Sequence, residues 1–176
     1  MNRIWKLSLV MVAIILLDQF TKGAIQQSFY LGESIPIIEG IFNFTYVRNP
    51  GAAFGFGADG GVVFRLVLFK IVPVFACFWL LYLIWLERNK SLLLSSAYAL
   101  IFAGAVGNLI DRFALNYVVD FLDFYIGRRH FPAFNVADSA ISIAAGLLII
   151  DFIRTIKQER EEKLKSLKSE AVKEEA

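Results

Sequence analysis

Asp120 and Asp138 are the two residues of this chain whose types and surroundings best suit joint chemistry. Two carboxyl groups that share a site cannot both ionise cheaply, so such a pair holds one proton near neutral pH. That state suits peptide hydrolysis, because the ionised carboxylate can take a proton from water while the protonated one hydrogen-bonds the scissile carbonyl. Asp120 is embedded in the apolar run 118–122, whereas Asp138 lies in the first turn of an expected helix, whose dipole favours its charge.

Structural interpretations of the same residues remain open from spacing alone. Asp138 could simply follow a helix cap at Asn135. Asp111, beside Arg112, could form a surface ion pair. The sequence pattern therefore offers catalysis as one of two explanations for these aspartates.

Other reactive side chains have less support. Ser139 has a carboxylate neighbour but no obvious base, and Lys22 or Lys70 would assist it only if the fold brings them close. The lone His130, between arginines and an aromatic residue, is expected to be a solvated loop residue, and Cys77 to be inert packing. One His and one Cys are too few for a conventional zinc site, and we expect neither a metal nor an organic cofactor.

The composition places these residues in a membrane protein. Of the 176 residues, 57% are hydrophobic and 15% are aromatic, which exceeds the apolar content of ordinary soluble domains. The net charge of +2 is too small to indicate nucleic-acid binding. We therefore expect one compact domain within the bilayer, at residues 1–153, followed by a charged tail at 154–176.

Four apolar runs are long enough to cross the bilayer, and we place them at about 4–20, 64–86, 91–110 and 136–153. The first run has the charged start of a secretory signal peptide but lacks a small-residue cleavage site, so we interpret it as a retained helix. The third run carries no charge at all. The Lys/Glu-rich tail is expected to be a solvated helix that frays.

Between the first two spans, residues 35–48 are rich in β-branched and aromatic residues and have turn residues in the middle. This pattern predicts a small strand pair that lies at the membrane interface. Residues 111–133 are interrupted by charge and are expected to be a connecting segment that holds Asp120 in a loop. The fold predicted from these patterns is an all-α membrane protein of four transmembrane helices with a small strand pair.

The distribution of positive charge predicts the orientation. With both termini in the cytoplasm, eleven Lys and Arg residues lie inside and five lie outside, although the outer segments are much longer than the inner hairpin. Four spans then bring the polar residues near the span ends to the same outer boundary: Asp18, Asn49, Asn108, Asp111, Arg112, Asp120, Asn135 and Asp138. Intramembrane ionisable groups indicate a functional site.

Five blocks of this polar set closely resemble the bacterial lipoprotein signal peptidases, or type II signal peptidases. They occur in that family's order and are Asp18-Gln-Phe-Thr-Lys22, Asn49-Pro-Gly-Ala-Ala-Phe54, Gly107-Asn108-Leu-Ile-Asp111-Arg112, Val119-Asp120-Phe121 and Phe134-Asn135-Val-Ala137-Asp138. The resemblance covers almost the whole chain and leaves only the tail outside.

The resemblance implies an aspartyl endopeptidase of the bacterial inner membrane that removes signal peptides from prolipoproteins, cutting before a cysteine that carries diacylglycerol. It implies that Asp120 and Asp138 are the catalytic pair and that Asp18, Lys22 and Asp111 support the site. Substrate-binding positions would be Asn49, Gly51, Gly104, Asn108, Arg112 and Asn135. The resemblance also implies a small extracytoplasmic β-cradle at about 33–60, in which 33–48 would supply the sheet and 51–60 a mobile helix. The implied fold is thus an all-α membrane protein of four transmembrane helices with a small extracytoplasmic β-cradle.

A lipid-modified prolipoprotein and membrane lipid are thus the expected partners, and nothing requires more than a monomer. Two other classes of protein would also carry aspartates among spans. A small membrane transporter would distribute polar residues through the depth of the bilayer, whereas here they gather at one edge. An assembly subunit would leave the aspartates dispensable.

Overall fold

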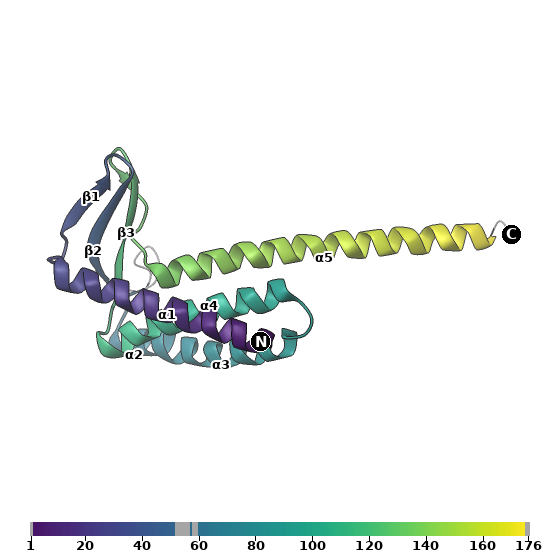
Figure 1. The fold of residues 1–176 in the computed structure, drawn as a ribbon, viewed down its shortest axis with the longest axis horizontal. Helices are drawn as coiled ribbons and strands as arrows, with labels where there is room; N and C mark the ends of the chain where they lie inside the picture. Colours follow the sequence, from purple (N-terminus) through teal and green to yellow (C-terminus); the bar gives the residue numbers. More distant parts are fainter. Residues whose placement is uncertain (1, 52–56, 58–59, 175–176) are drawn as a thin grey trace.

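The computed structural model describes residues 2–51, 57 and 60–174. Long helices lie side by side in a bundle, and an antiparallel sheet stands at one end of it (Figure 1). The N-terminus and the turn between α3 and α4 lie at the opposite end, and α5 extends beyond them (Figure 1). The predicted fold class, a membrane helical bundle with a small sheet, is confirmed.

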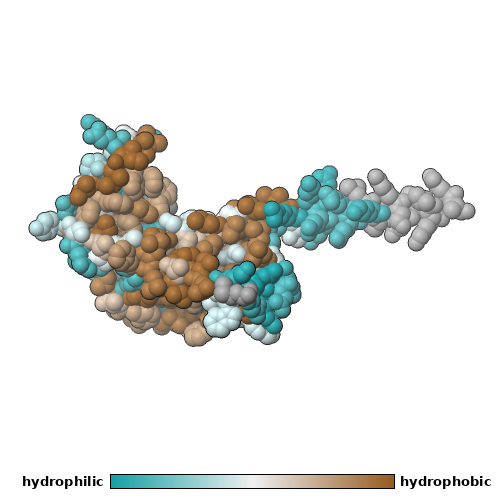
Figure 2. Space-filling model, viewed as in Figure 1, coloured by the Kyte–Doolittle hydropathy of each residue, from teal (hydrophilic) through white to brown (hydrophobic). Residues whose placement is uncertain are grey.

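Four helical segments of the described chain are long and apolar enough to cross a membrane. They are α1 (Arg3–Ser28), the continuous run α2 (Val62–Leu66), η2 (Val67–Ile71) and α3 (Val72–Glu87), then α4 (Leu92–Ala114), and finally α5 (Val136–Glu174), of which Val136–Lys163 meets these criteria. Their outward surfaces are covered by hydrophobic side chains, while the far part of α5 is hydrophilic (Figure 2). The charged tail is helical through Glu174, as a continuation of α5.

Two helices run further than the apolar patterns indicated. Helix α1 continues past residue 20 to Ser28, and α4 continues past residue 110 to Ala114. The polar residues expected to end these spans are buried and paired inside the protein, so they do not interrupt the helices. The second span contains the π-helical turn η2, which ends two residues before Pro73, whose missing N–H and bulky ring perturb the preceding turn.

The sheet has the order β1-β2-β3-β4, with β1 (Ser34–Ile38), β2 (Phe42–Asn49), β3 (Val118–Ile126) and β4 (Arg129–His130). The predicted strand pair at 35–48 corresponds to β1 and β2, which turn at Gly40 with φ of +80°. Gly40 has no Cβ, which makes this left-handed conformation inexpensive. The helix expected at 51–60 lies almost entirely outside the described residues.

Two expectations for the connecting segment were wrong. Asp120 lies on strand β3 rather than in a loop, and His130 lies on β4 rather than in a loop. The β-branched and aromatic neighbours of Asp120 suit a strand, and β2, far away in sequence, supplies the pairing partner. His130 Nδ1 lies 2.8 Å from Asp123 Oδ1, and its ring stacks on Tyr125, so this half-exposed residue belongs to the sheet.

Among the residues that the structure describes, buried apolar side chains form two clusters. One joins α1, α3 and α4 through Leu7, Met11, Ile84, Ala99 and Ala103. The other lies where the sheet meets the end of α1 and consists of Ile25, Tyr46, Val119 and Phe121. The second cluster fixes strand β3 on top of the helices, and with it the position of Asp120.

Candidate active site

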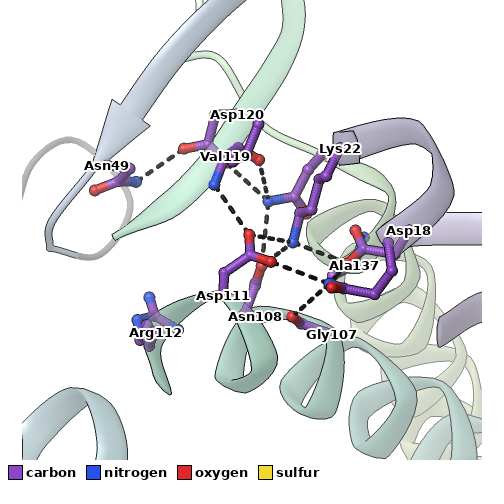
Figure 3. A network of polar contacts seen from close by, with 12 residues as sticks. Asp18, Lys22, Asn49, Gly107, Asn108, Asp111, Arg112, Val119, Asp120 and Ala137 are labelled. Carbon is purple, nitrogen blue, oxygen red and sulfur yellow. Dashed lines mark hydrogen bonds and ion pairs between the residues drawn. The ribbon is translucent and has the colours of Figure 1, made fainter. Parts of the chain in front are cut away.

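Lys22 of α1 is the centre of a buried polar network at the junction of helices and sheet (Figure 3). Its Nζ lies 2.8 Å from Asp18 Oδ2 and 3.0 Å from Asp111 Oδ2, and it donates to Asn108 Oδ1 at 3.0 Å. The side chains of Lys22, Asp18 and Asp111 are at most 4% exposed. One ammonium thus pairs with two carboxylates away from water, and removing it would leave both carboxylates without an ion-pair partner.

The two carboxylates of this network hold the backbone beside each candidate catalytic residue. Asp111 Oδ2 accepts a 3.0 Å hydrogen bond from the N–H of Val119, the residue before Asp120. Asp18 Oδ1 accepts a 2.9 Å bond from the N–H of Ala137, the residue before Asp138. The network therefore positions strand β3 and the start of α5 against α1 and α4.

Asp120 is buried on β3 with two amide donors on its carboxylate. Asn49 Nδ2 donates to Asp120 Oδ2 at 3.0 Å, and Asn135 Nδ2 donates to Oδ1 at 2.8 Å. Burial raises the pKa of Asp120 to about 7, and the nearby Asp138 carboxylate contributes in the same direction, while the two amides oppose the change. Asp120 thus titrates near neutral pH.

Asp138 lies in the first turn of α5. Asn135 is the residue directly before this helix. Asn135 Oδ1 accepts a 2.9 Å bond from the Asp138 N–H, so the helix cap considered from the sequence is present. Asn108 Nδ2 donates to Asp138 Oδ1 at 2.7 Å, and Asn135 Nδ2 lies 3.1 Å from Asn108 Oδ1. Two asparagine amides therefore connect the carboxyl of Asp138 to that of Asp120.

Both aspartates line one cavity of about 530 Å³. Asn49, Asn108 and Arg112 line it with them, and its other walls are residues 131–134 and the α5 face that carries Ile141 and Ile143. Ile143 is 59% exposed on the outer side of the bundle. The cavity thus combines a paired-carboxyl wall with an apolar wall beside the lipid-facing surface.

The remaining predicted site residues surround this cavity without all reaching it. Arg112 Nη2 donates to the Gly51 carbonyl at 3.0 Å, and its guanidinium lies over the Phe69 ring. A Cβ on Gly104 would collide with the Ala137 carbonyl and lie 2.7 Å from Ile141 Cγ1, so Gly104 permits close packing of α4 on α5. The structure therefore places Gly104 between these helices, while Gly51 presents its carbonyl to Arg112.

Sequence reasoning missed two features of the site. Gln19 Nε2 donates to Asp111 Oδ1 at 3.0 Å and to the Gly107 carbonyl at 3.1 Å, which extends the buried network. The apolar wall formed by 131–134 was also not anticipated. The available signals were an amide next to Asp18 within an apolar helix and the aromatic run directly before Asn135. In the described ranges, no group of three or more His, Cys, Asp or Glu side chains is arranged to hold a metal.

Membrane-spanning helices, together with one cavity that Asp120 of β3 and Asp138 of α5 both line, fit the class of membrane aspartic peptidases. The family described as signal peptidase (SPase) II matches residues 10–154 of the chain. The chain belongs to the signal peptidase II family, and it is a multi-pass aspartic peptidase of the bacterial inner membrane. The resemblance seen in the sequence motifs is confirmed.

Individual relatives agree with this assignment. The lipoprotein signal peptidase of Syntrophus aciditrophicus is 48% identical over 145 residues, which cover 82% of this chain and 90% of that protein. That of Shewanella pealeana is 51% identical over 144 residues, which cover 81% and 82%. A solved bacterial membrane enzyme superposes with a TM-score of 0.77 at 34% identity, covering 89% of this chain and 93% of its own.

Proposed function

We propose that Asp120 and Asp138 are the catalytic pair with which this chain removes the signal peptide of prolipoproteins, cutting before a cysteine that carries diacylglycerol. The observation that supports the assignment is the amide bridge through Asn135 and Asn108, which brings both carboxyl groups to one cavity. The raised pKa of Asp120, about 7, supplies the second requirement, a proton held between the pair near neutral pH.

In this mechanism Asp120 carries the shared proton and Asp138 is ionised at the N-terminal end of α5, where the helix dipole favours its charge. Asp138 takes a proton from water as the water oxygen attacks the scissile carbonyl. Asp120 donates its hydrogen to the carbonyl oxygen, which becomes the hydroxyl of a tetrahedral intermediate. Asp138 then gives its proton to the leaving nitrogen, and a hydroxyl of the intermediate returns a proton to Asp120. The C–N bond breaks as the carbonyl re-forms, and the signal peptide is released as a carboxylic acid.

The walls of the cavity fit a substrate that is part peptide and part lipid. Asn49 and Arg112 provide polar groups for the peptide, and Asn108 and Asn135 hold the carboxyl groups. The apolar wall of 131–134 with Ile141 and Ile143 offers the diacylglycerol chains a surface continuous with the lipid-facing side of α5. Gly51 holds Arg112 at the cavity by accepting a hydrogen bond from its guanidinium. Gly104 shapes the cavity by allowing α4 to approach α5 closely.

We further propose that both termini are cytoplasmic and that the active site is at the outer face of the membrane. The concentration of Lys and Arg in the N-terminus, the 87–90 hairpin and the tail supports this orientation. The sheet stands at the end of the bundle away from those segments (Figure 1). Asp120 of β3, a strand of that sheet, lines the cavity. A monomer in membrane lipid is sufficient, because one chain supplies every residue of the proposed site.

The decisive experiment measures cleavage of a diacylglyceryl prolipoprotein by purified wild type, Asp120→Asn and Asp138→Asn. Each substitution removes an ionisable group at nearly constant shape, and we expect a loss of roughly 10²–10⁴-fold or more. Asp151→Asn is the matched control, since Asp151 lies on α5 too but contacts Ser91 at the far end of the bundle. Normal cleavage by both site variants would contradict the assignment of Asp120 and Asp138 as the catalytic pair, because the reaction would then depend on other residues of the chain.

A further inference from the structure

A second cavity, of about 280 Å³, lies beside the first and has a different character. Its walls include three cationic side chains, Arg65, Lys70 and Arg112, and no acidic residue is among the described residues that line it. At about 30 Å³ for each water, the space corresponds to roughly nine water molecules. A cavity of this size and charge is suited to an anion and its attached group.

Lys70 and Arg112 contact neighbouring residues, and no ion pair found among the described residues neutralises the cations of this cavity. Lys70 Nζ donates to Asn116 Oδ1 at 2.9 Å and lies 5.3 Å from the centroid of the Phe113 ring. Arg112 Nε is buried without a hydrogen-bond partner in the part of the chain that the structure describes. The ion pairs found among the described residues include none of the three cations. The positive charge therefore remains available to a ligand.

Arg112 lines both cavities and so also faces the carboxyl groups of Asp120 and Asp138. Its charge is shared between the two sites. Arg65 and Lys70 line the second cavity but not the first, so Asp120 and Asp138 do not neutralise their positive charges. A phosphate group would find the two cations Arg65 and Lys70 there, and charge-assisted hydrogen bonds from them would stabilise it.

The rim of the second cavity indicates that this phosphate belongs to a lipid. Val62 and Leu66 line the cavity and are 75% and 44% exposed, on a helix that spans the membrane. An apolar groove begins on the same helix two residues after Lys70 and is lined by Val72, Phe75, Ala76, Phe78, Trp79 and Tyr82. A headgroup in the cavity can thus be continuous with an acyl chain on α3.

We propose that the cavity formed by Arg65, Lys70 and Arg112 binds the phosphate of an anionic phospholipid whose acyl chain follows α3. Basic pockets at the ends of membrane helices attract such headgroups by charge, and the apolar groove adds hydrophobic contact. This site goes beyond the proposed function, because the diacylglyceryl group of the expected substrate carries no phosphate. It lies on the other side of Arg112 from the aspartate pair.

Native mass spectrometry of the purified full chain, titrated with phosphatidylglycerol, phosphatidylcholine or diacylglycerol, tests the proposal. We expect phosphatidylglycerol to bind at least about tenfold more tightly than diacylglycerol, with phosphatidylcholine between them. Arg65→Gln/Lys70→Gln should weaken phosphatidylglycerol binding by about tenfold or more and leave diacylglycerol binding unchanged. Arg128→Gln, an exposed cation in the β3–β4 turn, is the control and should bind like wild type.

Equal binding of the three lipids, or an unchanged affinity in the double variant, would overturn the proposal. Displacement of phosphatidylglycerol by millimolar inorganic phosphate would also overturn it, since the site would then serve free phosphate. Crosslinking of wild type with a photoactivatable phosphatidylglycerol tests the site even if the double variant fails to fold. Labelled peptides should come from residues 60–82 and 110–118, and labelling confined to other segments would contradict the assignment.

Discussion

Asn135 and Asp120 are joined by a 2.8 Å hydrogen bond from the side-chain amide of Asn135 on the helix side to the carboxylate on strand β3. The oxygen of the same amide caps α5 by accepting from the Asp138 N–H. A single asparagine thus orients one aspartate by its nitrogen and begins the helix of the other by its oxygen. The separation of these two roles can be tested by substitution.

Asn135→Ala removes both the cap and the donor to Asp120, whereas Asn135→Asp retains a cap acceptor and places a carboxylate beside Asp120. We expect both variants to lose cleavage activity by at least about tenfold, and the alanine variant to lose about 1 kcal/mol of stability as well. Cleavage assays and thermal unfolding measure the two effects. Ser91→Ala removes the cap of α4 at the far end of the bundle, so it should lower stability but leave cleavage intact. Retained cleavage in both Asn135 variants would contradict the role of this amide.

The pH dependence of cleavage should report the proton on Asp120. Because burial raises the pKa of Asp120 to about 7, cleavage should fall as the pH rises through about 7 and that proton is lost. Asn49 donates to the ionised form of Asp120 and lowers its pKa, so Asn49→Ala should move this descending limb to higher pH.

The matched control for this pH profile is Asn43→Ala on the same strand. Asn43 is buried, and its amide donates to Asp123 rather than to Asp120. The descending limb should therefore stay at the wild-type position in this variant. The assignment of the proton to Asp120 would be contradicted if the descending limb of the pH profile stayed in place in Asn49→Ala. It would also be contradicted if the limb moved equally in Asn49→Ala and Asn43→Ala.

Lys22→Met should strongly destabilise the protein, because it leaves the carboxylates of Asp18 and Asp111 buried without their ammonium partner. Breaking a buried ion pair costs about 3–5 kcal/mol. Thermal unfolding in detergent measures the change, and Lys6→Met, at an exposed position of the same helix, should stay near wild type. An unchanged unfolding temperature in Lys22→Met would mean that the network does not stabilise the junction.

Gly104→Ala should separate α4 from α5, since the added methyl would meet the Ala137 carbonyl and Ile141. Overpacking of this kind costs about 1–3 kcal/mol, and a shift of Ala137 should also lower cleavage by displacing Asp138. Gly146→Ala on α5 is the control, because a Cβ there meets no atom within 4 Å. It should leave cleavage unchanged and gain up to about 1 kcal/mol from helix propensity. Equal behaviour of the two variants would exclude close packing as the role of Gly104.

Hydropathy predicted the helices well, because each span depends on the sum of many neighbouring residues. The uncharged run 91–110 corresponds to α4, and the strand pair at 35–48 corresponds to β1 and β2. The ends of spans were less predictable. Asp18 and Lys22 look like a span terminus in the sequence, yet they continue inside α1 because Asp111, far along the chain, pairs with the same lysine.

The sequence predicted which residues line the candidate site. It did not predict the strand that carries Asp120 or the hydrogen bonds that hold the two aspartates. Asp120, Asp138, Asn49, Asn108 and Arg112 do line one cavity. Their catalytic and binding roles stay predictions until the variants are assayed. Strand β3 was missed because a single strand gains its hydrogen bonds only from a partner, and the partner β2 lies some seventy residues earlier.

The sequence by itself determined that the chain crosses the membrane four times and that its polar residues gather at one edge, since burial of apolar runs in lipid is a local property of composition. The tertiary structure alone decided how Asp120 and Asp138 share a cavity. Their backbones are held by carboxylates from two other helices, one of them across 119 residues, and by amides that serve both groups. Such contacts depend on distance in space rather than along the chain, so only the folded molecule specifies them.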